Sequence, residues 1–119
     1  MVTATKNSRE LIDEWVAAGT WTSGYQNITT ALGGTLTAYI EISSSNDGSA
    51  SEVLVEISDD GSTWRKFSKI ESGTDTNTIY EFVFDIPASV MHIQVTITNN
   101  DSSNTIIGKA TLQELTSIE

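Results

Sequence analysis

Hydrophobic and polar residues alternate one by one along most of this chain, which is the pattern of β-strands that bury one face. The alternating stretches are residues 35–42, 53–58, 78–86, 90–98 and 105–115. The residues that this alternation places toward a core are Leu36, Ala38, Ile40, Ile42, Val53, Val55, Ile57, Tyr80, Phe82, Phe84, Ile86, Met91, Ile93, Val95, Ile97, Ile106, Gly108, Ala110 and Leu112. Residues 20–30 are rich in β-branched and aromatic residues and predict a further strand.

Turn signals separate the alternating stretches. Asp60-Gly61 follows one strand and predicts a tight turn, because glycine readily adopts the positive φ that short hairpin turns need. Pro87 ends another strand, since proline donates no hydrogen bond to a ladder. Polar loops fill residues 43–51, 71–77 and 99–104. Seven or eight strands without helices between them predict an all-β, antiparallel β-sandwich of jelly-roll or immunoglobulin-like topology.

The N-terminal segment departs from this pattern. Its apolar residues recur at helical spacing, at Leu11, Ile12, Trp15 and Val16. Asn7 or Ser8 would cap such a helix, with Glu10 three residues after Asn7, and Gly19 would end it. These signals favour a short helix over residues 8–18, with a strand or an extended arm as the alternative. We therefore expect an N-terminal arm or short helix at residues 1–19 and a β-sandwich domain at residues 20–119.

Length and charge limit the number of domains and the kinds of partner that we expect. A chain of 119 residues without cysteine fits one domain with a sufficient core and no disulfides. Sixteen acidic residues against six basic ones give a formal charge of −10, which disfavours nucleic acid and anionic lipid as partners. No apolar run approaches a membrane span of about 20 residues, and the first residues lack a secretory pattern. We expect a soluble, unprocessed chain.

Catalytic chemistry finds little support in the sequence. His92 is the single histidine, and no nucleophile or orienting acid accompanies it in the sequence. Most carboxylates fall in turns or on outward strand positions, where no apolar pocket raises a pKa. We therefore expect no enzyme and no cofactor. Weak calcium candidates are Asp47, Asp59, Asp60 and Asp101, although the hydrogen bonds that aspartate makes within turns explain these residues as well.

Aromatic and apolar residues at outward positions suggest contact with other molecules. The aromatic residues that would suit sugar stacking are Trp15, Trp21, Trp64, Tyr25 and Tyr39, although the same residue types also brace sandwich edges. The outward apolar residues are Tyr39, Ile79, Val83 and Ile107. Together they exceed the apolar surface that a monomer needs, which indicates a subunit interface.

Several stretches of the chain resemble a known group of proteins. These stretches are residues 20–28, Leu36-Thr-Ala-Tyr-Ile-Glu-Ile42, Ser58-Asp-Asp-Gly-Ser-Thr-Trp64 and the hairpin at residues 91–105. In this order they are similar to small β-sandwich virion proteins of tailed bacteriophages, most of all to capsid decoration (cement) proteins. The likeness extends over about residues 20–115. Discoidin-like and fibronectin-type modules carry a similar Ser-Asp-Gly-Trp turn, so this motif is moderately specific.

The resemblance implies a structural virion protein without catalytic activity. Such a protein is made in the bacterial host cytoplasm and binds the major capsid protein on the outer capsid surface, often as a trimer or dimer. It needs neither nucleic acid nor membrane. The interface candidates are the arm Met1 to Lys6, Trp15, Trp21 and Tyr39. The alternative is a carbohydrate-binding or tail-fibre module that uses Trp64, Tyr25 and the acidic loops.

Overall fold

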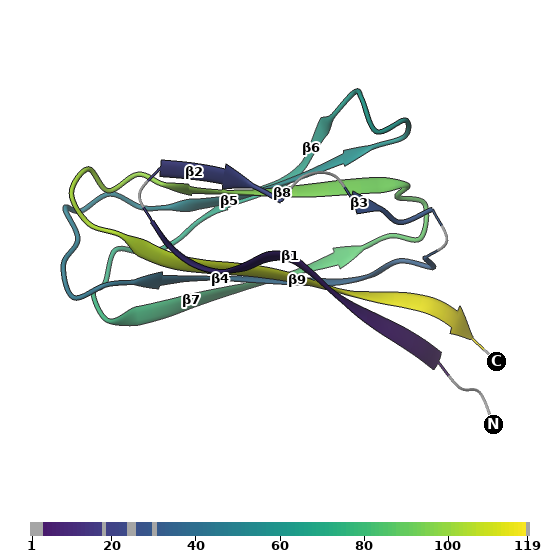
Figure 1. Cartoon of the computed structure of the whole chain (residues 1–119), viewed down its shortest axis with the longest axis horizontal. Coiled ribbons are helices and arrows are strands. Elements are labelled where there is room, and N and C mark those ends of the chain that lie inside the picture. The colour runs from purple at the N-terminus through teal and green to yellow at the C-terminus, as the bar shows by residue number, and fades with distance from the viewer. Residues whose placement is uncertain (1–3, 18, 24–25, 30, 119) are drawn as a thin grey trace.

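Two antiparallel β-sheets pack face to face in the computed structural model of the chain (Figure 1). The structure describes residues 4–17, 19–23, 26–29 and 31–118, with side chains for all of these except residues 4, 13–17, 19–22, 117 and 118. The strands are β1 (Ala4–Ala17), β2 (Gly19–Thr22), β3 (Gln26–Asn27), β4 (Gly34–Ile42), β5 (Glu52–Ser58), β6 (Arg65–Glu71), β7 (Thr78–Ile86), β8 (His92–Asn99) and β9 (Ile106–Ile118). The described residues form no helix that could cross a membrane.

The strand order distinguishes between the two topologies left open by the sequence. One sheet has the order β1-β9-β4-β7 and the other β2-β8-β5-β6, with β3 pairing beside β2 on β8. The chain therefore crosses between the sheets at almost every connection, and only β5 and β6 are neighbours both in sequence and in a sheet. This is the order of an eight-stranded jelly roll in which β2 and β3 share one position. The jelly-roll prediction is confirmed, and the immunoglobulin-like order is not found.

The core lies where the alternation predicted it. Inward residues of β4, β5, β8 and β9 are buried between the sheets, as are Phe84 and Ile86 of β7. Ile57, Tyr80 and Phe82 are partly buried and pack against this cluster. Met91 is the exception, because β8 begins one residue after it and its side chain is 41% exposed. The prediction that Met91 faces the core is wrong.

The helix favoured for residues 8–18 is also wrong. Residues Ala4–Ala17 form the edge strand β1, which pairs antiparallel with β9. The register shifts between Glu10 and Ile12 and again between Ile12 and Trp15. A bulge of this kind lets consecutive residues face the same side, and Leu11 and Ile12 are indeed both buried. A strand with such bulges can therefore carry adjacent apolar residues, which in the sequence look like the apolar face of a helix.

A buried ion pair connects the two sheets at one end of the sandwich. Glu114 of β9 is only 3% exposed and accepts hydrogen bonds from Asn7 and from Arg9, both in β1, at 2.8 Å each. The Arg9 guanidinium also donates to the backbone carbonyl of Asn27 in β3, on the opposite sheet. Arg9 therefore compensates the buried carboxylate and links the two sheets from β1, whose described end at Ala4 pairs with Ile118 of β9.

Candidate interaction surface

The outer face of the β1-β9-β4-β7 sheet carries the most exposed large apolar side chains among the described residues. Ile79 is 58% exposed and Val83 is 63% exposed, and both belong to β7. The alternation that buries Phe84 and Ile86 turns these two residues outward, because successive strand residues point to opposite faces. Tyr39 and Ile107 share this face and are half-buried. The four outward apolar residues predicted from the sequence thus lie on one sheet face.

The strand register sets the neighbours of each residue on this face. Tyr39 lies between Glu81 of β7 and Lys109 of β9. Glu41 likewise lies between Ile79 and Ile107 in the adjacent row. Apolar and acidic side chains therefore alternate along β7 and also stand next to each other across the strands, with Lys109 as the base in these two rows. The surface combines apolar contact area with negative charge.

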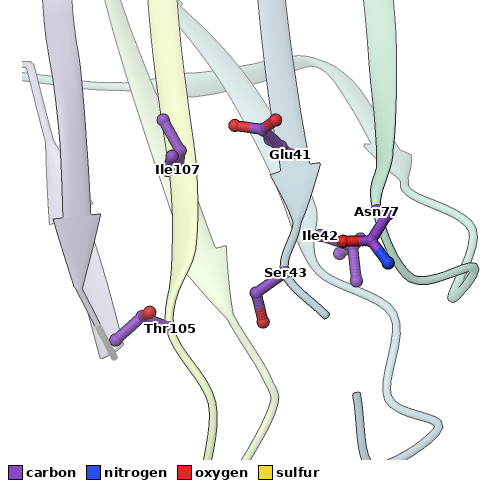
Figure 2. A pocket seen from close by; sticks show the side chains of 6 residues that line it. All are labelled: Glu41, Ile42, Ser43, Asn77, Thr105 and Ile107. Atoms are coloured by element: carbon purple, nitrogen blue, oxygen red, sulfur yellow. The ribbon is translucent and has the colours of Figure 1, made fainter. Parts of the chain in front are cut away.

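A shallow pocket of about 300 Å³ opens at the end of this face (Figure 2). The residues that line it are Glu41, Ile42, Ser43, Asn77, Thr105 and Ile107. Figure 2 shows the Glu41 carboxylate leaning toward β9, the strand that carries Ile107, so an acidic and an apolar side chain line the same pocket. Glu41 is the one titratable side chain in this lining, whereas glycoside hydrolysis needs a pair of carboxyl groups. The pocket suits a contact with a partner side chain better than acid–base catalysis.

The acidic residues of β4 and β7 on this face are not engaged in the ion pairs of the described fold. The ion pairs of the described residues join Arg9 to Glu114, Arg65 to Asp59, Lys69 to Glu52 and Lys109 to Glu10. Glu41, Glu81 and Asp85 take part in none of these ion pairs. Because Lys109 already binds Glu10, the outer side chains of β4 and β7 present acid without internal compensation.

Two of the calcium candidates join distant loops instead. Asp101 is buried in the loop after β8 and accepts a hydrogen bond from the backbone N–H of Asp47 at 2.9 Å. The Asp47 carboxylate in turn accepts the backbone N–H and the hydroxyl of Ser102, at 2.9 and 2.8 Å. We call this reciprocal contact between loops 43–51 and 99–104 the aspartate clasp. The Ser102 N–H holds the pKa of Asp47 well below its ordinary value, and the Ser103 N–H likewise lowers the pKa of Asp101.

The other two calcium candidates structure the hairpin between β5 and β6. Asp60 accepts the backbone N–H groups of Ser62 and Thr63 at 2.8 Å each, and Gly61 follows with φ of 79°. The Thr63 and Ser62 N–H groups lower the pKa of Asp60 from 3.8 to about 2. Asp59 binds Arg65 across the turn. The predicted reversal of the chain lies at Asp60-Gly61, but six residues separate Ser58 from Arg65, so the connection is longer than the tight turn expected.

The structure gives calcium binding no support of its own. Within the described part of the chain, no group of three histidine, cysteine, aspartate or glutamate residues is placed to hold a metal ion. The Asp47 and Asp101 oxygens that a cation would need accept N–H and O–H donors of the chain itself. Loop stabilisation accounts for both aspartates, and calcium binding stays a prediction.

The aromatic candidates divide between described and undescribed positions. The backbones of Trp15 and Trp21 pair with Gly108 in β9 and Ile97 in β8, but their side chains lie outside the described residues, as does all of Tyr25. Trp64 is half-buried and directly precedes β6. The structure therefore brings Tyr39 into a defined surface and leaves the other interface and sugar-binding candidates as predictions. Of the predicted arm, residues 4–6 belong to β1, and residues 1–3 lie outside the described part.

The aspartate clasp and the Arg9–Glu114 pair were missed by sequence reasoning. The bonded residues are 54 and 105 positions apart in the sequence. No motif with a short, fixed spacing could therefore predict these contacts. One available signal was Glu114, which continues the inward series of β9 after Leu112. An acid at a predicted core position calls for a basic partner.

Comparisons with known proteins find similarity at the level of the fold. No protein-family model matches the sequence, and no curated protein matches it. Among solved structures, the VP2 subviral particle of infectious bursal disease virus matches with a TM-score of 0.63 and 14% identity over 94% of this chain. A pilus-forming Bacillus endospore appendage matches with a TM-score of 0.58 and 16% identity over 97% of this chain. The SPBc2 prophage-derived protein YomS matches with a TM-score of 0.50 and 14% identity over 93% of this chain.

The matched proteins differ in how much of their own length is involved. This chain spans about a third of the bursal disease virus chain, 32% of its length. It spans 92% of the endospore appendage protein and 95% of YomS. At these identities the likeness establishes the fold, a β-sandwich that also occurs in a viral particle, in a pilus and in a prophage-derived protein.

Proposed function

We propose that this chain is a structural protein of a virus particle, most like the decoration proteins that bind the outer surface of a capsid. The observation that carries the proposal is the outer face of the β1-β9-β4-β7 sheet, where Ile79 and Val83 are exposed beside uncompensated acids. A monomer without partners gains nothing from so much exposed apolar surface on one strand. The major capsid protein is the proposed partner.

Three further points support this function. The aspartate clasp and the acidic hairpin turn use carboxylates for loop structure, so these groups are not arranged for catalysis. The fold recurs in a viral particle and in a prophage-derived protein. Attachment at many equivalent sites of a capsid lattice also lets a modest contact area hold the protein tightly.

The test is co-sedimentation of the purified protein with particles of the virus that encodes it. We expect saturable binding to expanded heads and much weaker binding to unexpanded procapsids, because expansion rearranges the outer lattice. A variant with Ile79→Thr and Val83→Thr should bind expanded heads less well. Failure of the wild-type protein to sediment with either particle would remove the proposal, and selective binding on a glycan array would favour the carbohydrate-binding alternative.

A further inference from the structure

The four sheet edges of the described fold differ in how well they are protected. Natural proteins shield edge strands by making them short, by bulges or by lysine, since an open edge pairs readily with another chain. β2 and β3 are short, with four and two residues. The pairing of β1 is interrupted by three register shifts. β6 carries a bulge, and Arg65, Lys66 and Lys69 are exposed on it.

β7 has none of these protections except charge. Its nine residues pair with β4 in one uninterrupted register from Thr78 to Ile86. The strand stands at the end of its sheet order, so its other side pairs with no described strand. Pro87 lies just beyond the last residue and leaves the whole length of β7 available. β7 is therefore a long, regular edge with Ile79 and Val83 exposed on it.

The charge on β7 selects among possible partners. Its outward residues are, in order, Ile79, Glu81, Val83 and Asp85, and neither acid takes part in an ion pair described above. If a second copy of β7 paired with the first over its whole length in an antiparallel arrangement, each Glu81 would lie diagonal to the acids of the other copy. Four carboxylates would then share one small face, where like charges repel. A partner strand with lysine or arginine opposite the acids would instead form favourable cross-strand pairs.

We propose that β7 binds an extended segment of a protein partner by strand addition, and that this segment alternates basic and apolar residues on its outer face. Main-chain hydrogen bonds along an edge supply affinity in such complexes, and alternate side chains supply specificity. The basic residues pair with Glu81 and Asp85, and the apolar residues cover Ile79 and Val83. The inference rests on the proposed function in so far as the partner is a capsid subunit.

The test uses the whole ¹⁵N-labelled protein and three synthetic eight-residue peptides. The first repeats lysine, threonine, valine and threonine twice, so that lysine and valine alternate on one face of the strand. The second has glutamate in place of lysine, and the third has the composition of the first but places its two lysines before its two valines on that face. We expect the alternating basic peptide to shift and protect the backbone amides of β7 and its neighbour β4. The acidic peptide should not bind, and the block peptide should bind several-fold more weakly, because it matches the charge but not the spacing.

Matched variants localise the contact. Glu81→Lys should weaken binding of the basic peptide by about tenfold at low salt, since it replaces attraction with repulsion at the edge. Glu71→Lys makes the same change on β6, the edge strand of the other sheet, and should change the affinity less than twofold. If Glu81→Lys alters the spectrum of the free protein, Glu81→Gln tests the same pair with a smaller expected loss.

Several outcomes would overturn the inference. They are equal binding of the block peptide, amide shifts centred on β1, β2 or β6, the absence of binding at millimolar peptide, and protection of β7 by self-association of the free protein. The outcomes for the two proposals separate cleanly. Head binding without peptide binding would refute strand addition and leave the virion role standing, whereas peptide binding without head binding would do the reverse.

Discussion

At the scale of single residues, the carboxylates of this chain do three different things. Asp47, Asp60 and Asp101 accept backbone N–H donors and hold loops in shape. Glu114 is buried and compensated by Arg9. Glu81 and Asp85 stand exposed on the β7 edge. The carboxylates behind the formal charge of −10 are therefore not equivalent. Some stabilise the fold, and others are exposed and available to a partner.

The loop aspartates predict a stability that falls in acid. Folding lowers the pKa of Asp47, Asp60 and Asp101, so their contribution is complete above the ordinary value of 3.8 and is lost as the pH falls through the folded-state values. We expect the melting temperature to drop between pH 4 and pH 2. Asp101→Asn should lower it at pH 6 and reduce its dependence on pH below 4. An unchanged pH profile in this variant would contradict the role of the clasp.

The Arg9–Glu114 ion pair predicts that truncating Arg9 alone strongly lowers the stability of the fold. Arg9→Ala leaves the Glu114 carboxylate buried without its cation and should lower the free energy of unfolding by about 2–3 kcal/mol, measured with urea. Lys109→Ala breaks the more exposed pair with Glu10, whose atoms lie 3.4 Å apart, and should cost less than about 1 kcal/mol. Equal losses in the two variants would show that burial of Glu114 does not matter.

Two glycines with positive φ predict different costs for the same substitution. A Cβ on Gly33 would come within 2.5 Å of the Ile86 carbonyl oxygen, whereas a Cβ on Gly48 would meet no atom within 4 Å. Gly48→Ala should cost only the strain of the left-handed backbone, about 1 kcal/mol. Gly33→Ala adds a clash with the backbone of β7 and should cost clearly more. Thermal unfolding of both variants checks this, and the opposite ranking would contradict the described turn.

At the scale of strands, the sequence predicts regular elements well and irregular ones poorly. In β4, β7, β8 and β9 the buried and the more exposed residues alternate along the strand, and nearly all of the inward residues follow from the sequence. The alternation fails in β1, where bulges place Leu11 and Ile12 on the same side and imitate a helix. Strand order and the pairing of distant loops were also out of reach, since both depend on contacts between residues far apart in the chain.

The candidate surface was predictable for the same reason as the core. An outward position is the complement of an inward one, so Tyr39, Ile79, Val83 and Ile107 followed from the alternation that placed Tyr80 and Phe84 inside. What the sequence left open was that β7 forms an edge, because this depends on the sheet order. The edge, rather than the exposed residues alone, is what points to strand addition.

The exposed residues of β7 predict a separation of binding from stability. The double variant Ile79→Thr and Val83→Thr should change the free energy of unfolding by less than about 1 kcal/mol, because both side chains are already in water and threonine suits a strand. Its affinity for heads should fall at least about fivefold. Leu32→Thr is the control, since Leu32 is also exposed but lies outside β7. An equal loss of head binding in the control would contradict a specific role for this edge.

At the scale of the whole molecule, the outer face of the β1-β9-β4-β7 sheet belongs to a jelly roll whose two sheets share one apolar core. Both sheets are tied together by the apolar core and by the Arg9–Glu114 pair, so the outer face keeps its shape without a partner. A preformed surface loses little conformational entropy when it binds. This suits a protein that attaches at many equivalent positions on a particle.

The most direct measurement is amide hydrogen exchange of the protein alone and bound to expanded heads. The account predicts slower exchange in residues 78–86 on the particle, with the acidic hairpin at residues 58–64 unchanged. Protection confined to the β6 edge or to the hairpin turn, with β7 exchanging as it does in free solution, would contradict it.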